Sequence, residues 1–470
     1  MIDRKATLVL PKAATKQLQA HLFQDGLEAA ALLVCAPVRG RRLKLLVQEI
    51  VPVPHAACQT RQRDAISWPG AYVEAAIDRA EPASSAIIAV HSHPQGLFAF
   101  SGTDDASDEI LLPALLHATG RVSGSAIMVP GGAMRARLYE PPGMMAPVMT
   151  PVELVMSVGD DLTLWWNDGP SVTRAFRPPV AFTSGMSAWL SRMSACVIGV
   201  SGTGSIVAEQ LARLGFGEII LIDFDKLERR NLNRILNSSL ADADAKLLKV
   251  EMFAAAIQRY HPACEVFRVP HSIASHESIF AACEADVLFS CVDTAEGRHV
   301  ADRLASCFAM PLLDVGVSIP TRGSMSGERE IAEVCGRIDY VYPGGSRLQD
   351  RGVYDATTLE AEYLARVAPG AYRQKVTDGY LRGLEEQAPA VITLNMRAAS
   401  ACVMEFIARA FPFRHDPNAT RARTVFMLAD GEEEVFAEAQ FPVLSHFPVA
   451  AGAQEPLLGL PAFAKKETVT

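Results

Sequence analysis

The chain has 470 residues, of which 49% are hydrophobic, and its formal net charge is −9. This length exceeds one ordinary hydrophobic core and predicts two or three domains, while the acidic balance without a basic run argues against nucleic acid as the main partner. No stretch reaches the ~18–20 apolar residues of a membrane span or has the long apolar core of a signal peptide. Nine scattered cysteines without a CxxC pair favour a reducing, cytoplasmic location over a disulfide framework.

Residues 1–148 are predicted to form a separate α/β unit. Apolar residues at helical spacing predict its helices, and short apolar runs between turn residues predict its strands. In chain order we expect a helix at 12–23, strands at 30–35 and 43–50, a helix at 72–79, a strand at 86–90 and a helix at 104–117.

A group of potential metal ligands follows the strand at 86–90. This strand leads into His91-Ser-His93-Pro94, and seven residues separate His93 from Ser101-Gly-Thr-Asp104. Side chains alternate along a strand, so both imidazoles lie on one face, and Asp104 at the start of the next helix can add an oxygen. Two imidazoles and one carboxylate leave a fourth position for water, which is the plan of a catalytic zinc site. Zinc would lower the pKa of that water towards ~7.

Such a hydrolytic site also needs a general base. Glu28, just before the strand at 30–35, is the preferred candidate. Glu49 is the alternative, although it lies inside the strand at 43–50.

These segments resemble the JAMM signature of the JAB/MPN metallo-isopeptidases. The catalytic glutamate of that family lies in an E-x-x-G-x-L-x-G segment, which here is Glu28-Ala-Ala-Ala31-Leu-Leu33-Val-Cys35, with alanine and cysteine in place of two glycines. The resemblance implies that His91, His93 and Asp104 bind zinc and that Ser101 helps to stabilise the tetrahedral oxyanion. Ser101 could also serve mainly as a helix cap.

A boundary is predicted near residue 150. The segment 139–151 contains four prolines, and few helices or strands survive that density. We therefore assign 149–168 to a linker, within which 162–167 is a short strand that carries exposed tryptophans or an interdomain patch.

The next unit, 169–415, begins with a glycine-rich turn. A buried strand at 195–200 is followed by Gly199, Gly202 and Gly204, a helix from about Ser205 to 214, and a strand at 218–222 that ends on Asp223. This is the phosphate turn of a dinucleotide-type fold, followed at ~20 residues by an acid that can hold ribose hydroxyls. The glycines allow a phosphate to approach the free N–H groups of the helix.

The residues after the turn favour a triphosphate over a dinucleotide. Asp223-Phe-Asp225 is followed by Asn231-Leu-Asn233-Arg234 and Lys246, and both basic side chains could reach a polyphosphate. With the segment GVSGTGS at 199–205 and Asp293 after an apolar strand, the pattern resembles the ThiF-type adenylyltransferases, the superfamily of ubiquitin-activating enzymes and bacterial sulfur-carrier activators. Ser201 replaces one glycine of that pattern.

The ThiF resemblance implies ATP and Mg²⁺ as ligands, with Asp293 on the magnesium and Arg234 and Lys246 supporting catalysis. It also implies a lead-in arginine, for which Arg174, Arg177 and Arg192 are alternatives. The ATP-binding residues implied are Gly199, Gly202, Gly204, Ser205, Asp223, Asp225, Asn231, Asn233, Arg234, Lys246 and Asp293.

The remaining elements continue a doubly wound α/β pattern. We expect a long helix at 244–260, strands at 265–269, 285–291 and 311–317, a helix at 391–410, and then a C-terminal region, 416–470, with a hairpin turned at Asp430-Gly431 and a loose tail. Residues 343–388 contain no cysteine, so the family's structural zinc and crossover thioester are not expected. Cys335 and Cys402 are expected in the core. Polar residues 356–388 could form a lid over the nucleotide or a dock for a protein tail.

The sequence thus predicts an α/β chain in which a JAB-like metalloprotease domain precedes a Rossmann-like ThiF-type domain. The resemblances imply a bifunctional enzyme that cleaves after the C-terminus of a small ubiquitin-like or sulfur-carrier protein and adenylates the freed carboxylate. A conjugating or sulfur-donor partner and a homodimer formed through the second domain are also implied. The alternatives are a metabolic enzyme that acts on a small carboxylate and amide, and a scaffold with one inactive module.

Overall fold

The computed structural model of the chain describes residues 5–141, 148–168, 184–323, 329–378, 380–381, 391–444 and 447–464. Its contacts define two units, which we describe separately. Unit 1 comprises 1–178 with 306–309 and 448–470, and unit 2 comprises 179–305 with 310–447.

Unit 1 is built on a sheet whose strand order is β11-β10-β1-β3-β2-β6-β7-β8-β9. Parallel pairing joins β1 to β10, β1 to β3, and β6 to β7, and the other neighbours are antiparallel. A small hairpin, β4 (Thr60–Arg61) with β5 (Ile66–Ser67), lies outside this sheet. The strands are β1 (Ala6–Pro11), β2 (Ala30–Arg39), β3 (Leu43–Pro52), β6 (Ala86–Ser92), β7 (Ser123–Met128), β8 (Met134–Tyr139), β9 (Met149–Pro151), β10 (Leu154–Val158) and β11 (Leu162–Trp166).

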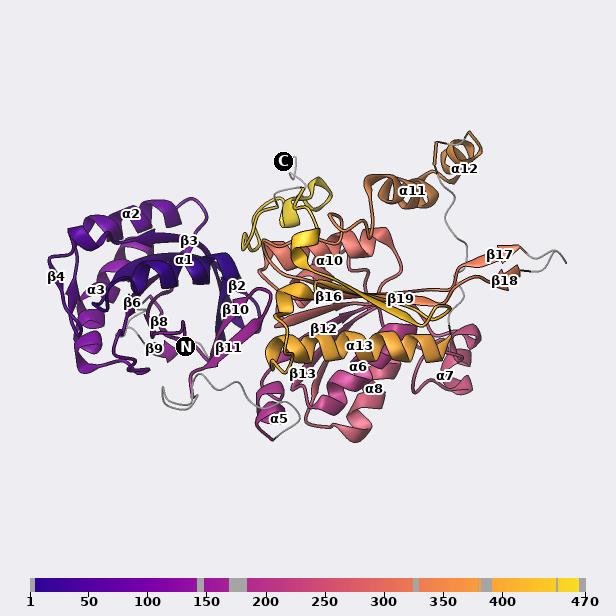
Figure 1. Cartoon of the computed structure of the whole chain (residues 1–470), viewed down its shortest axis with the longest axis horizontal. Coiled ribbons are helices and arrows are strands. Elements are labelled where there is room, and N and C mark those ends of the chain that lie inside the picture. Colours follow the sequence, from indigo (N-terminus) through magenta and orange to yellow (C-terminus); the bar gives the residue numbers. More distant parts are fainter. Residues whose placement is uncertain are drawn as a thin grey trace, which may run out of the picture. The chain divides into compact units, whose positions relative to one another are not determined.

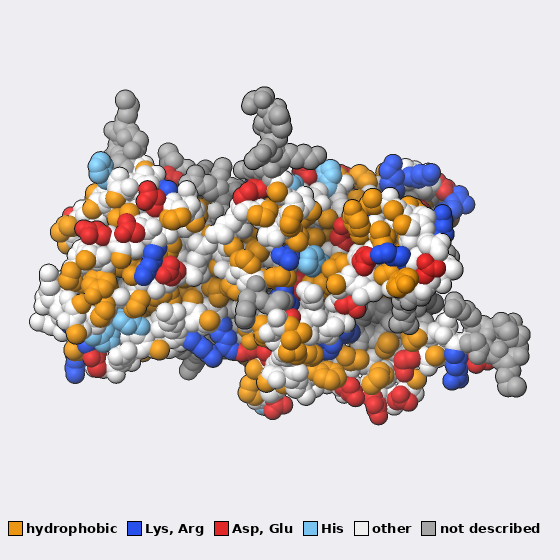
Figure 2. Space-filling view, turned by 90° about the horizontal axis from the view of Figure 1, so that it is seen from above, with side chains coloured by type: hydrophobic (Ala, Val, Ile, Leu, Met, Phe, Trp, Pro, Cys, Tyr) orange, Lys and Arg blue, Asp and Glu red, His pale blue; other side chains and the backbone are white. Residues whose placement is uncertain are grey.

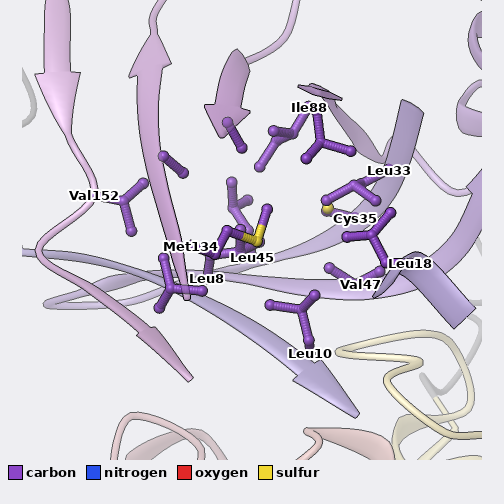
Figure 3. Packing of buried hydrophobic residues seen from close by; sticks show 14 of the residues in the cluster. Leu8, Leu10, Leu18, Leu33, Cys35, Leu45, Val47, Ile88, Met134 and Val152 are labelled. Carbon is purple, nitrogen blue, oxygen red and sulfur yellow. The ribbon is translucent and has the colours of Figure 1, made fainter. Parts of the chain in front are cut away.

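Helices cover both faces of this sheet. Leu18 of α1 (Lys12–Leu22) packs with Leu33 and Ile88 on one face (Figure 3). Residues of α2 (Ala71–Ala80) and α3 (Gly102–Thr119) pack with Leu32 and Ile87 on the other. Neighbouring residues of β2 and β6 therefore serve opposite cores, as alternation along a strand requires. This double burial explains why the strands are nearly continuous apolar runs.

The predicted linker at 149–168 is wrong. Its residues form β9, β10 and β11, and β10 pairs in parallel with β1 from Thr7↔Leu154 to Pro11↔Val158. The short strand expected at 162–167 is present as β11, every residue of β10 is buried, and Trp166 is 3% exposed, which excludes the exposed-tryptophan alternative for this residue. The proline-rich segment lies just before three short strands. One of them, β10, pairs with β1 near the N-terminus of the chain, so this pairing cannot be read from local sequence.

Unit 2 contains an eight-stranded sheet in the order β14-β13-β12-β15-β16-β19-β20-β21. The first five strands of this order are parallel and the last three are antiparallel additions. The strands are β12 (Ser194–Ile198), β13 (Glu218–Ile222), β14 (Glu265–Val269), β15 (Val287–Ser290), β16 (Leu312–Ser318), β19 (Cys335–Val341), β20 (Arg423–Met427) and β21 (Glu432–Phe436), with a separate hairpin of β17 (Thr321–Gly323) and β18 (Arg329–Ile331).

Helices again lie on both faces, with α6, α8 and α13 on one side and α10 on the other (Figure 1). This is the expected doubly wound arrangement, in which ligands bind beyond the carboxyl ends of the parallel strands. The helices are α5 (Ser184–Leu190), α6 (Gly202–Leu214), α7 (Leu240–Asp244), α8 (Lys249–Tyr260), α9 (His276–Ala282), α10 (Ala295–Cys307), α11 (Ala356–Val367), α12 (Pro369–Thr377) and α13 (Ile392–Ala410).

Two further expectations need correction. The helix expected at 244–260 begins only at Lys249, as α8, because α7 ends at Asp244 and Lys246 in the turn between them has φ +50°, a left-handed conformation that interrupts a helix. The hairpin expected within 416–470 is confirmed, because β20 pairs with β21, but it is not separate, because β20 also pairs with β19 and extends the second sheet. Beyond it, Leu457, Leu458 and Phe463 are buried, so this part of the tail is packed.

No helix in the described part of the chain has the length and apolar character needed to cross a membrane. On the face shown in Figure 2, hydrophobic, acidic and basic side chains are interspersed. Such a mixed surface is ordinary for a folded chain, so the functional sites must be sought in specific side-chain groups.

Candidate functional site

Three predicted metal ligands converge at the end of β6 and the start of α3. The Nε2 atoms of His91 and His93 are 3.0 Å apart, and Asp104 oxygens lie 2.9 Å from the first and 3.4 Å from the second. Ligands at the ~2.0–2.1 Å zinc bond length of a tetrahedral site are separated by about 3.3 Å, so these distances suit three corners of one tetrahedron. The donor set therefore fits a zinc ion with one open position.

Outer contacts hold these ligands in place. His93 Nδ1 lies 2.8 Å from the Leu97 carbonyl oxygen, which leaves Nε2 for a metal. The Asp104 N–H donates to Ser101 Oγ at 3.2 Å, and the Ser101 N–H donates back to the Asp104 carboxylate. Ser101 is thus the cap of α3 and also lies directly beside a ligand. Burial opposes ionisation of Asp104, but hydrogen bonds from His91 and His93 lower its pKa well below the ordinary value.

The structure brings Glu28 to this group. Its carboxylate forms a cluster with His91 and His93, in which the ligand atoms all lie within 4.8 Å of one another. Glu28 is 6% exposed, and burial raises its pKa, which suits a general base. Its N–H donates to the Gln62 carbonyl at 2.7 Å, so the β4–β5 hairpin fixes its position. Glu49 instead forms an exposed ion pair with Arg79 at 3.3 Å.

The glycine turn of unit 2 has the compact form that phosphate binding needs. Gly199 has φ +86°, and a Cβ on Gly204 would collide with the Gly199 carbonyl. A Cβ on Gly202 would collide with the amide of Asn395. Ser201 is the N-cap residue of α6 but makes no side-chain capping bond, so it leaves the first N–H groups of the helix uncapped.

Asp223 lies behind this turn. It is 8% exposed, and its two oxygens accept the N–H groups of Val200 and Asp225, each at 2.8 Å. Burial raises the pKa of Asp223, and the nearby Lys249 ammonium opposes that rise. The carboxylate thus ties the glycine turn to the loop after β13, where a ribose would lie in this fold.

The lysine beside these acids is Lys249 rather than Lys246. Lys249 is 4% exposed, and its Nζ lies 2.7 Å from Asp225 and 3.9 Å from Asp223. Lys246 is exposed in the turn before α8 and forms no ion pair with any residue that the structure describes. The sequence could have indicated Lys249, because apolar residues at helical spacing begin only at Val250. That pattern places the start of the helix at Lys249 rather than at Asp244.

The Asn-x-Asn-Arg segment forms a tight loop. Asn231 is buried and accepts the Glu228 N–H at 3.0 Å, which is a structural role. Arg234 Nη1 donates to Asn233 Oδ1 and to the Arg230 carbonyl, both at 3.1 Å. Ser205 is fully buried and links the Gly202 carbonyl to the Leu236 N–H at 3.2 Å each, so it joins the glycine turn to this loop.

The other predicted positions are placed as follows. Asp293 is exposed between β15 and α10, at the carboxyl end of the parallel strand β15. Cys402 is fully buried, and burial raises its pKa well above the ordinary value. Cys335 is partly exposed rather than in the core, and its thiol lies 3.6 Å from the Ser318 carbonyl. Arg192 is half-buried after α5, and Arg174 and Arg177 lie outside the described residues.

Comparisons with known proteins identify two families along the chain. Residues 11–138 match the prokaryotic homologs of the JAB domain, and residues 177–329 match the ThiF family. Ubiquitin-like modifier-activating enzyme 5 of Culex quinquefasciatus is 30% identical over 167 residues, which are 33% of this chain and 38% of that protein. The Bombyx mori protein of the same name is 30% identical over 161 residues, or 32% and 37% of the two chains. The matches therefore span under two fifths of these relatives.

Solved structures that are similar to part of the chain include MccB. Escherichia coli MccB with ATP shares 16% identity, with a TM-score of 0.40 over 54% of this chain and 66% of that chain. The microcin C7 biosynthetic enzyme MccB in complex with N-formylated MccA shares 17% identity, with a TM-score of 0.42 over 54% and 67%.

Proposed function

Because the chain joins a prokaryotic JAB-type domain to a ThiF-family domain, we propose that it first trims and then activates the C-terminus of a small ubiquitin-like or sulfur-carrier protein. The observation that carries this proposal is the convergence of Glu28, His91, His93 and Asp104 in the same chain as an uncapped glycine turn backed by Asp223. The two chemistries are consecutive, since hydrolysis produces the carboxylate that adenylation consumes.

In the first domain, His91, His93 and Asp104 would hold zinc. Zinc bound there would supply Lewis acidity and a water of lowered pKa. The Glu28 carboxylate takes a proton from the attacking water and passes it to the leaving nitrogen of the peptide or isopeptide bond. Its partial burial keeps the proton affinity of Glu28 above that of a solvated glutamate. The Ser101 hydroxyl donates to the carbonyl oxygen as that oxygen becomes negative.

In the second domain, a carboxylate oxygen of the carrier attacks the α-phosphorus of ATP. The bond from that phosphorus to the bridging oxygen of the β-phosphate breaks, and pyrophosphate leaves with its electron pair. The reaction needs charge stabilisation more than a base. We assign this to the N–H groups of the turn, Arg234 and Lys249, with Asp223 on the ribose and Asp293 as the magnesium ligand. Lys249 takes the role first expected of Lys246, because it is the lysine that lies beside the two acids.

The proposed product is the acyl adenylate itself. A sulfur donor, an amine or a partner's thiol would then accept the activated carboxylate. Two observations support the acyl adenylate, rather than a thioester, as the product. Residues 343–388 contain no cysteine, and Cys402 is buried.

The proposal is tested with the full chain and a set of carrier proteins that carry a short C-terminal extension. We expect mass spectrometry to show cleavage after the carrier terminus, and ATP–pyrophosphate exchange to begin only with the trimmed carrier. A matched pair of variants separates the steps: Glu28→Gln should block cleavage and retain exchange with trimmed carrier, and Arg234→Ala should do the reverse. Exchange driven by a small carboxylate alone would favour a metabolic enzyme, and neither activity with any carrier would favour a scaffold.

A further inference from the structure

Asn395 is a buried polar residue that the proposed chemistry leaves unexplained. It lies in the first turn of α13 and is 2% exposed. Its Oδ1 atom has no hydrogen-bond partner among the residues that the structure describes. Burying an unpaired amide is unfavourable, so native structures retain one mainly where a ligand or water completes it.

The Asn395 amide reaches the glycine turn. Its Nδ2 atom occupies the space that a side chain at Gly202 would need, so Gly202 is required here for contact with α13 as well as for the turn. The Cδ atom of Arg234 lies 3.3 Å from the same point. Asn395 and Arg234 therefore flank the first residue of α6 from two separate parts of the chain.

The helices α6 and α13 begin side by side at this point. Gly202 adjoins Asn395, Gln210 Nε2 donates to Ser400 Oγ at 2.9 Å, and the Phe216 and Phe406 rings are 5.5 Å apart. These contacts advance in the same direction along both helices, so the helices are parallel. Neither helix has an acidic residue in its first turn or a side-chain cap at its N-terminus. The positive ends of both helices therefore act on one location.

We propose that Asn395 is a phosphate-binding residue of the nucleotide site and that the N-terminus of α13 forms its second wall. This inference rests on the proposed adenylation function. The Asn395 Nδ2 group donates to a phosphoryl oxygen between the turn and Arg234, and Oδ1 accepts an N–H of Arg234 when that guanidinium turns towards the phosphates. The ligand is an anion with several acceptor oxygens, because N–H donors and positive helix ends converge there.

Thermal unfolding and pyrophosphate exchange of the full chain test this assignment. Asn395→Leu keeps the branching of the side chain at Cγ and removes both polar atoms. Without ligand, we expect its midpoint to equal or exceed that of the wild type, because an unpaired buried amide is lost. With ATP and Mg²⁺, its ligand-induced shift should fall, and its KM for ATP in exchange should rise about tenfold or more. Asn395→Asp should bind ATP still more weakly, since it places a carboxylate against the phosphates.

Ser400→Ala on the same helix is the matched control and should retain the wild-type response to ATP. Asn395→Ala provides a second, smaller variant with the same expected loss. A wild-type response to ATP in both Asn395→Leu and Asn395→Ala, together with a lowered midpoint without ligand, would make the residue structural and overturn the inference. A wild-type chain that responds neither to ATP nor to pyrophosphate would overturn the proposed adenylation itself.

Discussion

Lys249 Nζ lies 2.7 Å from the Asp225 carboxylate, and this ion pair joins the first residue of α8 to the loop that follows β13. Asp223, on the same loop, accepts the N–H of Val200 in the glycine turn. The Asp225 N–H also donates to Asp223 at 2.8 Å, so three consecutive contacts link the lysine, the ribose-side acid and the phosphate turn. A charge at Lys249 is buried within this group, whereas a charge at Lys246 is not.

The first prediction follows from this difference. Lys249→Met should reduce the rate of ATP–pyrophosphate exchange by about 100-fold or more, because it removes a cation from a site where charge-assisted contacts each contribute ~1.5–3 kcal/mol. Lys246→Met should keep a rate within about twofold of the wild type. Circular dichroism of both variants controls for folding. A large loss in Lys246→Met with normal exchange in Lys249→Met would restore the assignment expected from the sequence pattern.

The second prediction concerns the metal. The full chain should bind one zinc ion per JAB-type domain, and His91→Ala and Asp104→Ala should each lose it, because each removes a donor from a three-ligand set. Glu28→Gln should keep the zinc and lose carrier cleavage by about 100-fold or more. The measurements are elemental analysis and cleavage rate, with Glu49→Gln as the control. Full zinc in either ligand variant, or normal cleavage by Glu28→Gln, would contradict the site as assigned.

The third prediction is a pH dependence of stability. Burial, with help from Arg303 and Arg347, lowers the pKa of His299 to about 4. Arg303 Nε donates to His299 Nε2 at 3.2 Å, a bond that requires the neutral imidazole. The unfolded chain binds more protons than the folded chain between pH ~6.5 and ~4, so stability from neutral His299 is complete above ~6.5 and is lost as the pH falls towards 4.

A pKa difference of this size corresponds to at most about 3 kcal/mol of unfolding free energy, and solvent screening of the partly exposed His299 ring lowers that contribution. The variant His299→Gln cannot titrate, so its unfolding midpoint in urea should fall less between pH 7 and pH 4.5 than that of the wild type. His271→Gln, at an exposed histidine, should follow the wild type. Parallel pH curves for His299→Gln and the wild type would show that His299 is not the group responsible.

Local spacing explains which parts of the fold and sites could be predicted. The predicted ligands His91, His93 and Asp104 lie at the ends of two consecutive elements, so their short spacing in the sequence already places them close together. Such local segments also predict the JAB plus ThiF fusion, which the family matches confirm. The errors come from distant partners. β10 pairs with β1 across almost the whole of unit 1. The contact of Asn395 with Gly202, about which the sequence made no prediction, likewise joins residues that are far apart in the chain.

Backbone conformation explains the late start of α8. The break between α7 and α8 depends on a left-handed residue, Lys246, that no apolar pattern predicts. Tertiary contacts decide the environment of Asp108 in α3, which is 7% exposed and accepts hydrogen bonds from Arg137 Nε at 2.7 Å and Tyr139 Oη at 3.0 Å. Its partners come from β8, so only the folded unit reveals its role.

The last prediction separates adenylate formation from thioester formation. Exchange of pyrophosphate into ATP with trimmed carrier should survive Cys335→Ser and Cys402→Ala with less than about a threefold change, because neither thiol lies among the residues that we assign to the phosphates. The Cys402 thiol is fully buried, and its raised pKa disfavours the thiolate that would attack an adenylate. The raised pKa of Cys335, to which burial contributes most, acts in the same direction. A carrier–enzyme adduct that is cleaved by added thiol, and is lost in one of these two variants, would show instead that a cysteine of this chain accepts the activated carrier.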